Sequence, residues 1–369
     1  MAELEISARE DPPRWLVYGT PVFTILAALA VSSVALVAID VNPFVAYTEL
    51  FVGTFSTVDN VVEVLIKTVP LALTGLAVYI PYRANLWNIG AEGQLYVGAI
   101  VGTWVAVNVE LPIPGLVVLV LVAGGIAGAL FGAIAGGLRA KWGVNEIIVT
   151  LMLTFAATRI TDYLVQGPMQ GASGALSGSA LIPGPAQVPS IGNTRLHAGV
   201  FIVLLATVLS WVVISRTVHG FKITMTGSNP DAAEQAGIDR GKLYVLVFVL
   251  GGALAGLAGI IEIAGVQGRL RSTFSPGYGF TAIPIALLGR NGAFRVLLAA
   301  TFFAVLFVGG QNIVVSQNVP SALIEIIQAL VILFLITAEF FKNFKIDFTL
   351  DEPGDVNAPA DPDLAGENR

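Results

Sequence analysis

The sequence predicts an all-α, polytopic membrane protein with about ten transmembrane helices. Of its 369 residues, 55% are hydrophobic and only 12% are charged, and the mean hydropathy is +0.81. A soluble domain carries about 25% charged residues, so this composition excludes one. The chain has no cysteine and two histidines, which excludes disulfide frameworks and leaves no set for a zinc ribbon or a Cys or His nucleophile system.

Ten apolar stretches have the length of roughly 20 residues that a helix needs to cross the hydrocarbon core of a bilayer. They are bounded by charges, prolines or glycine clusters. The first is too long for the core of a signal peptide and follows several acidic residues, so we expect an uncleaved span. In chain order the stretches are 15–39, 60–81, 91–109, 114–138, 145–166, 198–215, 243–265, 273–289, 295–312 and 319–341.

The lysines and arginines predict that both termini are cytoplasmic. With a cytoplasmic N-terminus, thirteen basic residues fall on the cytoplasmic side and only Arg195, Arg269 and Arg271 fall outside. Lys and Arg are enriched in cytoplasmic connections, so this asymmetry sets the orientation. It also requires an even number of crossings, and for that reason we count 273–289 as a span although Pro and Gly interrupt it.

Four segments complete the predicted organisation. Residues 1–14 form a cytoplasmic N-terminal segment and residues 15–341 the transmembrane domain. An external loop at 167–197, rich in Gly, Ser and Pro, is expected to be a lid or a docking loop. The tail at 342–369 is expected to be acidic, disordered and cytoplasmic, because residues 346–369 alone carry a charge of −6, equal to the net charge of the chain.

Small residues recur every fourth position on two of the predicted spans. They are Gly124, Gly128, Gly132 and Gly136 on one span, and Gly251, Ala255 and Gly259 on another. Faces of this kind let helix backbones approach closely in lipid. We therefore interpret both faces as packing surfaces, within the bundle or between subunits.

Charged residues inside the spans are candidates for structural pairs or for ion coupling. Glu63 and Lys67 are four residues apart, and Arg159 and Asp162 are three apart, so each acid can pair with its base on one helix face. Glu262 and Glu325 lie near span ends, and we expect both to be solvated.

Two polar interruptions of the apolar pattern are candidates for a solute path, because interrupted helices offer polar groups inside a bilayer. The first, residues 81–94, contains Asn85, Asn88, Glu92 and Gln94. The second, residues 274–280, combines Pro and Gly breaks with aromatic rings that could stack on a flat or ring-shaped solute. The alternatives are a capped cytoplasmic turn for the first and a simple kink for the second.

The cytoplasmic loop at 216–242 contains a short, well-capped helix. Asn229 and Pro230 are typical of a helix start, acidic residues follow in the first turn, and Gly237 is expected to end the helix. Such a helix has no use in crossing a membrane but suits docking into a groove of a soluble partner. The alternative is a plain connector.

At these residues the sequence resembles the permease subunits of ABC importers, in the branch that includes simple-sugar, branched-chain amino acid and nucleoside systems. The stretch 227–238 resembles their coupling helix. Residues 88–94, 143–148, 274–280 and 286–290 are similar, more narrowly, to the larger permease of purine-nucleoside (guanosine-type) importers. The resemblance covers about residues 15–341.

The resemblance implies a set of partners and residue roles. The partners are two cytoplasmic ABC ATPase subunits, a second and shorter permease that forms a heterodimer with this chain, and an extracytoplasmic substrate-binding lipoprotein, in the lipid bilayer of the cell membrane and without nucleic acid. Coupling to the ATPase is expected at Gly227, Asn229, Pro230, Ala232, Ala233, Gly237 and Ile238. Candidates for the translocation path are Asn85, Asn88, Glu92, Gln94, Asn145, Glu146, Phe274, Tyr278 and Phe280.

The chain is expected to be a transport subunit without catalytic or metal-binding residues and without a cofactor. It lacks the G-x-x-x-x-G-K-[ST] loop, so ATP would be used by the partner ATPase. The leading hypothesis is alternating access for a nucleoside or a related small solute. One alternative is the same machine moving a simple sugar. Another is a secondary transporter driven by ions through Glu63, Lys67 or Arg159, while a membrane-embedded enzyme finds no supporting residue set.

Overall fold

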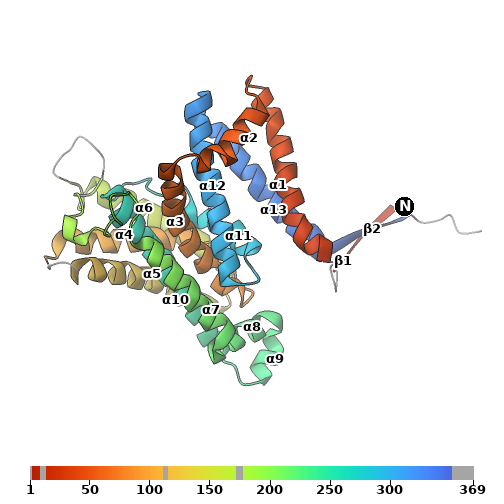
Figure 1. The fold of residues 1–369 in the computed structure, drawn as a ribbon. Helices are drawn as coiled ribbons and strands as arrows, with labels where there is room; N and C mark the ends of the chain where they lie inside the picture. Colours follow the sequence, from red (N-terminus) through yellow and green to blue (C-terminus); the bar gives the residue numbers. More distant parts are fainter. Residues whose placement is uncertain (1, 9–13, 111–114, 172–177, 351–369) are drawn as a thin grey trace, which may run out of the picture.

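The computed structural model describes residues 2–8, 14–110, 115–171 and 178–350 (Figure 1). Short 3₁₀ turns occur at Gly53–Phe55 and Gly184–Ala186, and a π-helical turn at Ile263–Gln267. The helices are α1 (Arg14–Val37), α2 (Pro43–Phe51), α3 (Val58–Tyr82), α4 (Ala91–Asn108), α5 (Gly115–Trp142), α6 (Glu146–Gln166), α7 (Gly199–Arg216), α8 (Val218–Ser228), α9 (Pro230–Gln235), α10 (Arg240–Glu262), α11 (Tyr278–Leu288), α12 (Ala293–Gln317) and α13 (Ser321–Asn343). Two strands, β1 (Ala2–Ala8) and β2 (Phe344–Leu350), complete the described elements.

Each of the ten predicted apolar stretches contains one helix, so the helical membrane fold is confirmed. Among the described residues, 7 helices are long and apolar enough to cross a membrane. These are α3, α5, α6, α7, α12, α13 and α10 extended by its π-helical turn. Three of the elements were not predicted: α2, α8 and the ribbon of β1 and β2.

The predicted span at 273–289 differs from the structure in length. Helix α11 has 11 residues, which at 1.5 Å per residue gives about 16 Å, or half of the hydrocarbon thickness. It starts after Gly277, whose φ of 90° is left-handed and incompatible with continuing a helix from residues 268–276. This segment is therefore irregular up to Gly277 and helical from Tyr278 to Leu288.

Helix α3 is the centre of the bundle. Every residue from Thr68 to Pro81 is buried, because α7, α10, α11 and α12 all pack around it. Its two internal prolines, Pro70 and Pro81, leave backbone carbonyls that lack an intrahelical donor. The carbonyl of Ala77, which lacks a donor because of Pro81, accepts the side-chain amide of Asn88 at 3.1 Å. Thr74 adds a further hydrogen bond from its hydroxyl to the carbonyl of Pro70 at 2.7 Å.

The small-residue faces pack against each other inside the chain. A Cβ atom at Gly128 would overlap the carbonyl oxygen of Gly252, and one at Gly256 would overlap that of Gly124. Helices α5 and α10 therefore touch backbone to backbone, as expected where packing replaces the hydrophobic drive. Gly259 makes a similar contact with the carbonyl of Leu95 in α4. The packing interpretation of both faces is confirmed.

The two ends of the described chain lie together. Helix α1 packs along α13, and β1 pairs antiparallel with β2 in a register that places Ile6 opposite Ile346 (Figure 1). Residues 344–350, which the sequence assigns to the tail, thus form a strand. The remainder of the predicted tail, 351–369, lies outside the described residues.

Replacing Gly128 with Ala should destabilise the packing of α5 on α10 by about 1–3 kcal/mol, because the added methyl group forces the two backbones apart. Gly137 on the same helix is the matched control, since no heavy atom lies within 4 Å of its added Cβ. There Ala should stabilise the helix by up to about 1 kcal/mol. Thermal unfolding of the purified variants in nanodiscs measures both shifts, and shifts of the same sign would contradict this account of the packing.

Candidate functional site

The loop at 216–242, which the sequence predicts to be cytoplasmic, forms two helices at one end of the bundle (Figure 1). Asn229 separates α8 from α9, and its side chain accepts a hydrogen bond from the backbone N–H of Ala232 at 3.0 Å. Pro230 occupies the first helical position, and Gly237, with a φ of 79°, follows the last turn. The predicted start and end of this helix are confirmed.

A few residues in and next to α9 are buried against the bundle, whereas the others are exposed. Ala233 and Ile238 are buried, and the N–H of Ile238 donates to the carbonyl of Ala233 at 3.0 Å. Arg240, at the start of α10, forms ion pairs with Asp231 and Glu234 of α9. Asn229, Asp231 and Glu234 are exposed, as a docking surface requires. Because these ion pairs connect α9 to α10, a displacement of α9 would be transmitted to α10.

Helix α8 connects the same surface to the interior. A Cβ atom at Gly227 would overlap the carbonyl oxygen of Arg83, and Arg83 donates to the hydroxyl of Thr224 at 3.2 Å. Arg83 follows α3 and begins the first polar interruption. The coupling candidate Gly227 thus contacts Arg83, which lies five residues before the buried Asn88 in the sequence.

Asn88 and Gln94 form a closed amide pair inside the bundle. Each amide nitrogen donates to the other side chain's oxygen, at 2.9 and 3.0 Å, and Asn88 also donates to the carbonyl of Ala77 at 3.1 Å. Asn88 is fully buried and Gln94 is 2% exposed. In this conformation the two amides satisfy each other, whereas Asn85 is exposed in a left-handed turn with a φ of 58°.

Glu92 lies where two helix N-termini meet. It is in the first turn of α4, and its carboxyl group accepts the backbone N–H of Gly279 in the first turn of α11 at 2.6 Å. A Cβ atom at Gly279 would overlap the backbone nitrogen of Glu92, so only glycine permits this approach. The two interruptions that the sequence singled out are therefore in direct contact.

The aromatic residues of the second interruption point in different directions. Phe274 is buried against Tyr96, with ring centroids 4.6 Å apart. Tyr278 is fully buried and accepts a hydrogen bond from the ammonium group of Lys67 at 3.0 Å. Phe280 is 42% exposed. In this conformation the three rings do not form one stacking surface.

Asn145 and Glu146 belong to the turn between α5 and α6. Asn145 caps α6 by accepting the N–H of Ile147 at 2.9 Å. Glu146 pairs with Arg139 at 3.4 Å and accepts the N–H of Trp87 at 3.5 Å. Glu146 thus holds Trp87, the residue that precedes Asn88, close to the end of α5.

Two expectations for the intramembrane charges are wrong. Glu63 pairs with Arg195 of the external loop at 3.5 Å, whereas Lys67 bonds to Tyr278. Glu262 is 2% exposed instead of solvated, because the π-helical turn after α10 brings Gln267 within 3.1 Å of its carboxyl group. The sequence does hold a signal for Glu262, an acid within an otherwise apolar run. Arg159 and Asp162 do pair, at 3.2 Å, on an exposed face.

The external loop lies over the end of α10. The N–H of Ser179 donates to the carbonyl of Leu270 at 2.8 Å, and that of Ile182 to the carbonyl of Gly268 at 2.8 Å. The N–H of Val188 reaches the carbonyl of Ala264 at 3.0 Å. These bonds fix the loop to the turn and the irregular segment that precede α11. The lid interpretation stays a prediction.

Comparison with known proteins identifies one family. The description "Branched-chain amino acid transport system / permease component" matches residues 60–336. The chain is 53% identical to the glucose ABC transporter permease protein TsgB13 of Haloferax volcanii over 97% of both chains. It is 33% identical to the guanosine ABC transporter permease protein NupP of Bacillus subtilis, covering 85% of this chain and 92% of that one.

Further relatives occur in pairs. The chain is 29% identical to the nucleoside ABC transporter permease protein NupB of Lactococcus lactis, covering 85% of this chain and 89% of that one. From each of these three organisms a second permease protein is less similar, at 26%, 28% and 24% identity. The chain thus resembles one member of each pair more than the other.

Replacing Asn88 with Leu should destabilise the protein by about 1–3 kcal/mol, because it leaves the amide of Gln94 buried without its partner. Replacing both Asn88 and Gln94 with Leu should recover part of that loss, since no polar side chain is then left unpaired, while the carbonyl of Ala77 still lacks the donor that Asn88 supplied. Thermal unfolding in nanodiscs measures the cycle. Asn108→Leu is the control, because that side chain is exposed and bonds to the carbonyl of Trp104. Additive losses in the double variant would contradict the pairing.

Proposed function

Because this chain belongs to the family of permease components of the branched-chain amino acid transport system, we propose that it forms the membrane path for a neutral solute containing a sugar ring. The carrying observation is the 53% identity to a glucose permease over 97% of both chains. A simple sugar is therefore the first candidate. A nucleoside is the second, supported by the guanosine and nucleoside permeases at 33% and 29% identity.

The chain is a permease subunit of an ABC transporter, a membrane transport component rather than an enzyme. Membership in this family implies ATPase and substrate-binding partners. We assign ATP binding and hydrolysis to the partner ATPase and no cofactor to this chain. The exposed surface of α9, with its buried anchors Ala233 and Ile238, is the part that docks to the ATPase.

The second permease and the binding lipoprotein are further parts of the proposal. In three organisms the relatives form pairs with unequal similarity to this chain, which supports a heterodimer of two different permeases. The substrate-binding partner is proposed to be a lipoprotein on the external face of the cell membrane. Its docking surface would include the external loop that lies over α10.

The proposed topology has ten crossings with both termini in the cytoplasm. The pairing of β1 with β2 supports the placement of both ends on the same side of the membrane, because two strands can pair only when they lie on one side. An even count then requires residues 268–288 to cross as one unit, irregular in the outer part and helical in α11. Helix α11 would begin near the midplane, as discontinuous helices do in transporters.

The junction at Glu92 supports a neutral solute. Helix N-termini attract anions, and two of them, those of α4 and α11, converge there. The carboxyl group of Glu92 already occupies the backbone N–H of Gly279, so the site offers no free positive end to an anionic substrate. A polyhydroxylated ring needs no such charge.

Uptake experiments separate the two solute candidates. Cells carrying the gene should accumulate labelled glucose, and excess unlabelled glucose should reduce the uptake at least tenfold more strongly than guanosine, adenosine or ribose. Cells lacking the gene provide the background. Preferred competition by guanosine would establish the nucleoside candidate instead, and uptake of neither class above the background would contradict the proposal.

Replacing Gly237 with Val should abolish the substrate-stimulated ATPase activity of the reconstituted complex. The left-handed φ of 79° costs a non-glycine residue about 1–2 kcal/mol, so the turn after α9 would change its path. Gly237→Asn is the matched control, because Asn adopts this conformation readily. Full stimulation in the Val variant would contradict coupling through this turn, provided that both variants assemble equally in the membrane.

A further inference from the structure

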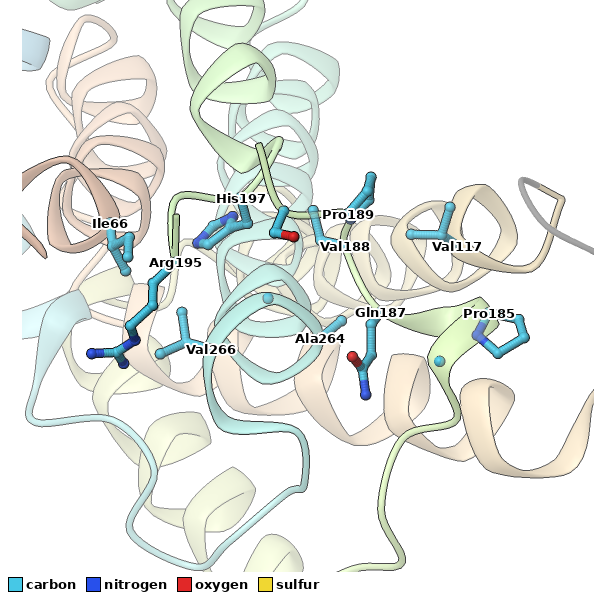
Figure 2. Close-up of a pocket in the computed structure, with 13 residues that line it drawn as sticks. Ile66, Val117, Pro185, Gln187, Val188, Pro189, Arg195, His197, Ala264 and Val266 are labelled. Carbon is cyan, nitrogen blue, oxygen red and sulfur yellow. The ribbon is translucent and has the colours of Figure 1, made fainter. Parts of the chain in front are cut away.

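A cavity of about 500 Å³ lies on the external side, between the external loop, α3 and the π-helical turn after α10 (Figure 2). Small-molecule sites measure about 300–1,000 Å³, so the cavity is large enough for a hexose or a nucleoside. Its walls include Ile66 of α3 and Val266 of the turn, and Arg195 and His197 come from the loop. Figure 2 shows the imidazole turned toward Ile66 and Arg195, with Pro185 and Gln187 at the other end.

His197 has a buried hydrogen-bond donor without an acceptor. Its side chain is 2% exposed, and its Nδ1 atom accepts the backbone N–H of Gly199 at 3.2 Å. A neutral imidazole that accepts at Nδ1 carries its proton on Nε2. No partner for Nε2 exists among the described residues. A buried donor of this kind costs free energy unless an acceptor arrives.

The surrounding backbone fixes the position of the His197 ring. Gly265 and Gly199 flank the imidazole, and a Cβ atom at Gly265 would lie 3.0–3.2 Å from its atoms. The bond from the N–H of Val188 to the carbonyl of Ala264 holds the loop against the same turn. π-helical turns are frequent at functional sites in proteins. Two independent features, the unpaired donor and the interrupted helix, thus meet at one cavity.

The charges around the cavity select the kind of ligand. Arg195 is paired with Glu63 at 3.5 Å, so its positive charge is balanced. Burial lowers the pKa of His197 to about 4, which leaves the ring neutral at physiological pH. These are the two titratable residues among those lining the cavity. The cavity therefore suits an uncharged molecule rich in oxygen acceptors, not an anion.

We propose that this cavity is an external binding site for the transported solute, in which the Nε2–H group of His197 donates to a ring or hydroxyl oxygen. The solute occupies it after leaving the binding protein and before entering the path through the bundle. The inference rests on the proposed function, because it takes the neutral sugar-ring solute from there. It adds a site outside the family's coupling region and away from Glu92.

The test is nitrogen NMR of the ¹⁵N-histidine-labelled transporter complex in nanodiscs. This chain has only two histidines, and His219 lies on the exposed cytoplasmic side, so it is an internal control. The Nε2 signal of His197, assigned by its loss in His197→Phe, should shift when glucose or guanosine is added. Glucose 6-phosphate, which is anionic, should cause no shift. No shift with either neutral solute at millimolar concentration overturns the inference.

Variants give a second readout. His197→Phe should raise the KM for uptake about tenfold, because one hydrogen bond to the solute is lost. His197→Gln keeps a donor and should retain most of the affinity, while His219→Gln should match the wild type. Equal KM values for all variants overturn the site. If the wild-type complex transports neither solute, the proposed function fails instead, so the two failures are distinguishable.

Discussion

The hydrogen bond between the carboxyl group of Glu92 and the backbone of Gly279 is the contact on which the arrangement of the interior depends. A bilayer contains no water to satisfy free backbone groups, so a helix can begin inside the bundle only if something bonds to its first N–H groups. Helices α4 and α11 both begin in the bundle's interior, and one side chain serves their junction. The absence of a side chain at Gly279 allows the approach. The chain can therefore be non-helical before both α4 and α11 without leaving backbone N–H groups unsatisfied at their junction. The interruption before α11 also brings Tyr278 within hydrogen-bonding distance of Lys67.

Local sequence signals predicted the helices and the cytoplasmic turn, because those structures depend on neighbouring residues. The apolar stretches became helices, and Asn229, Pro230 and Gly237 delimit α9 as their individual conformational preferences require. Side-chain partners could not be predicted in the same way. Glu63 bonds to Arg195, and Lys67 to Tyr278, across sequence separations that no helical spacing specifies. The burial of Glu262 could not be predicted from its position near a span end, because it depends on the turn that folds Gln267 back over its carboxyl group.

The contacts also connect the surface formed by α8 and α9 to the interior in two ways. One route runs through Arg240 from α9 into α10, whose far end carries the turn beneath the external loop. The other runs from α8 through Arg83 to the loop that carries Asn88. Both routes consist of rigid helices joined by ion pairs, hydrogen bonds or backbone contacts, and together they reach the Glu92 junction and the external loop. A displacement of α8 and α9 by a partner would thus act on both sides of the polar interior.

The pairing of the two chain ends has a consequence for biogenesis. The ribosome makes α1 first and α13 last, yet these two helices pack on each other and continue into the paired strands β1 and β2. The family match covers residues 60–336, so α1 and α2 lie outside it. During synthesis α1 is therefore made long before its main packing partner α13, with only the nearby α2 and its Tyr47 available earlier among the contacts described. A chain released before α13 would leave the α13-facing side of α1 uncovered.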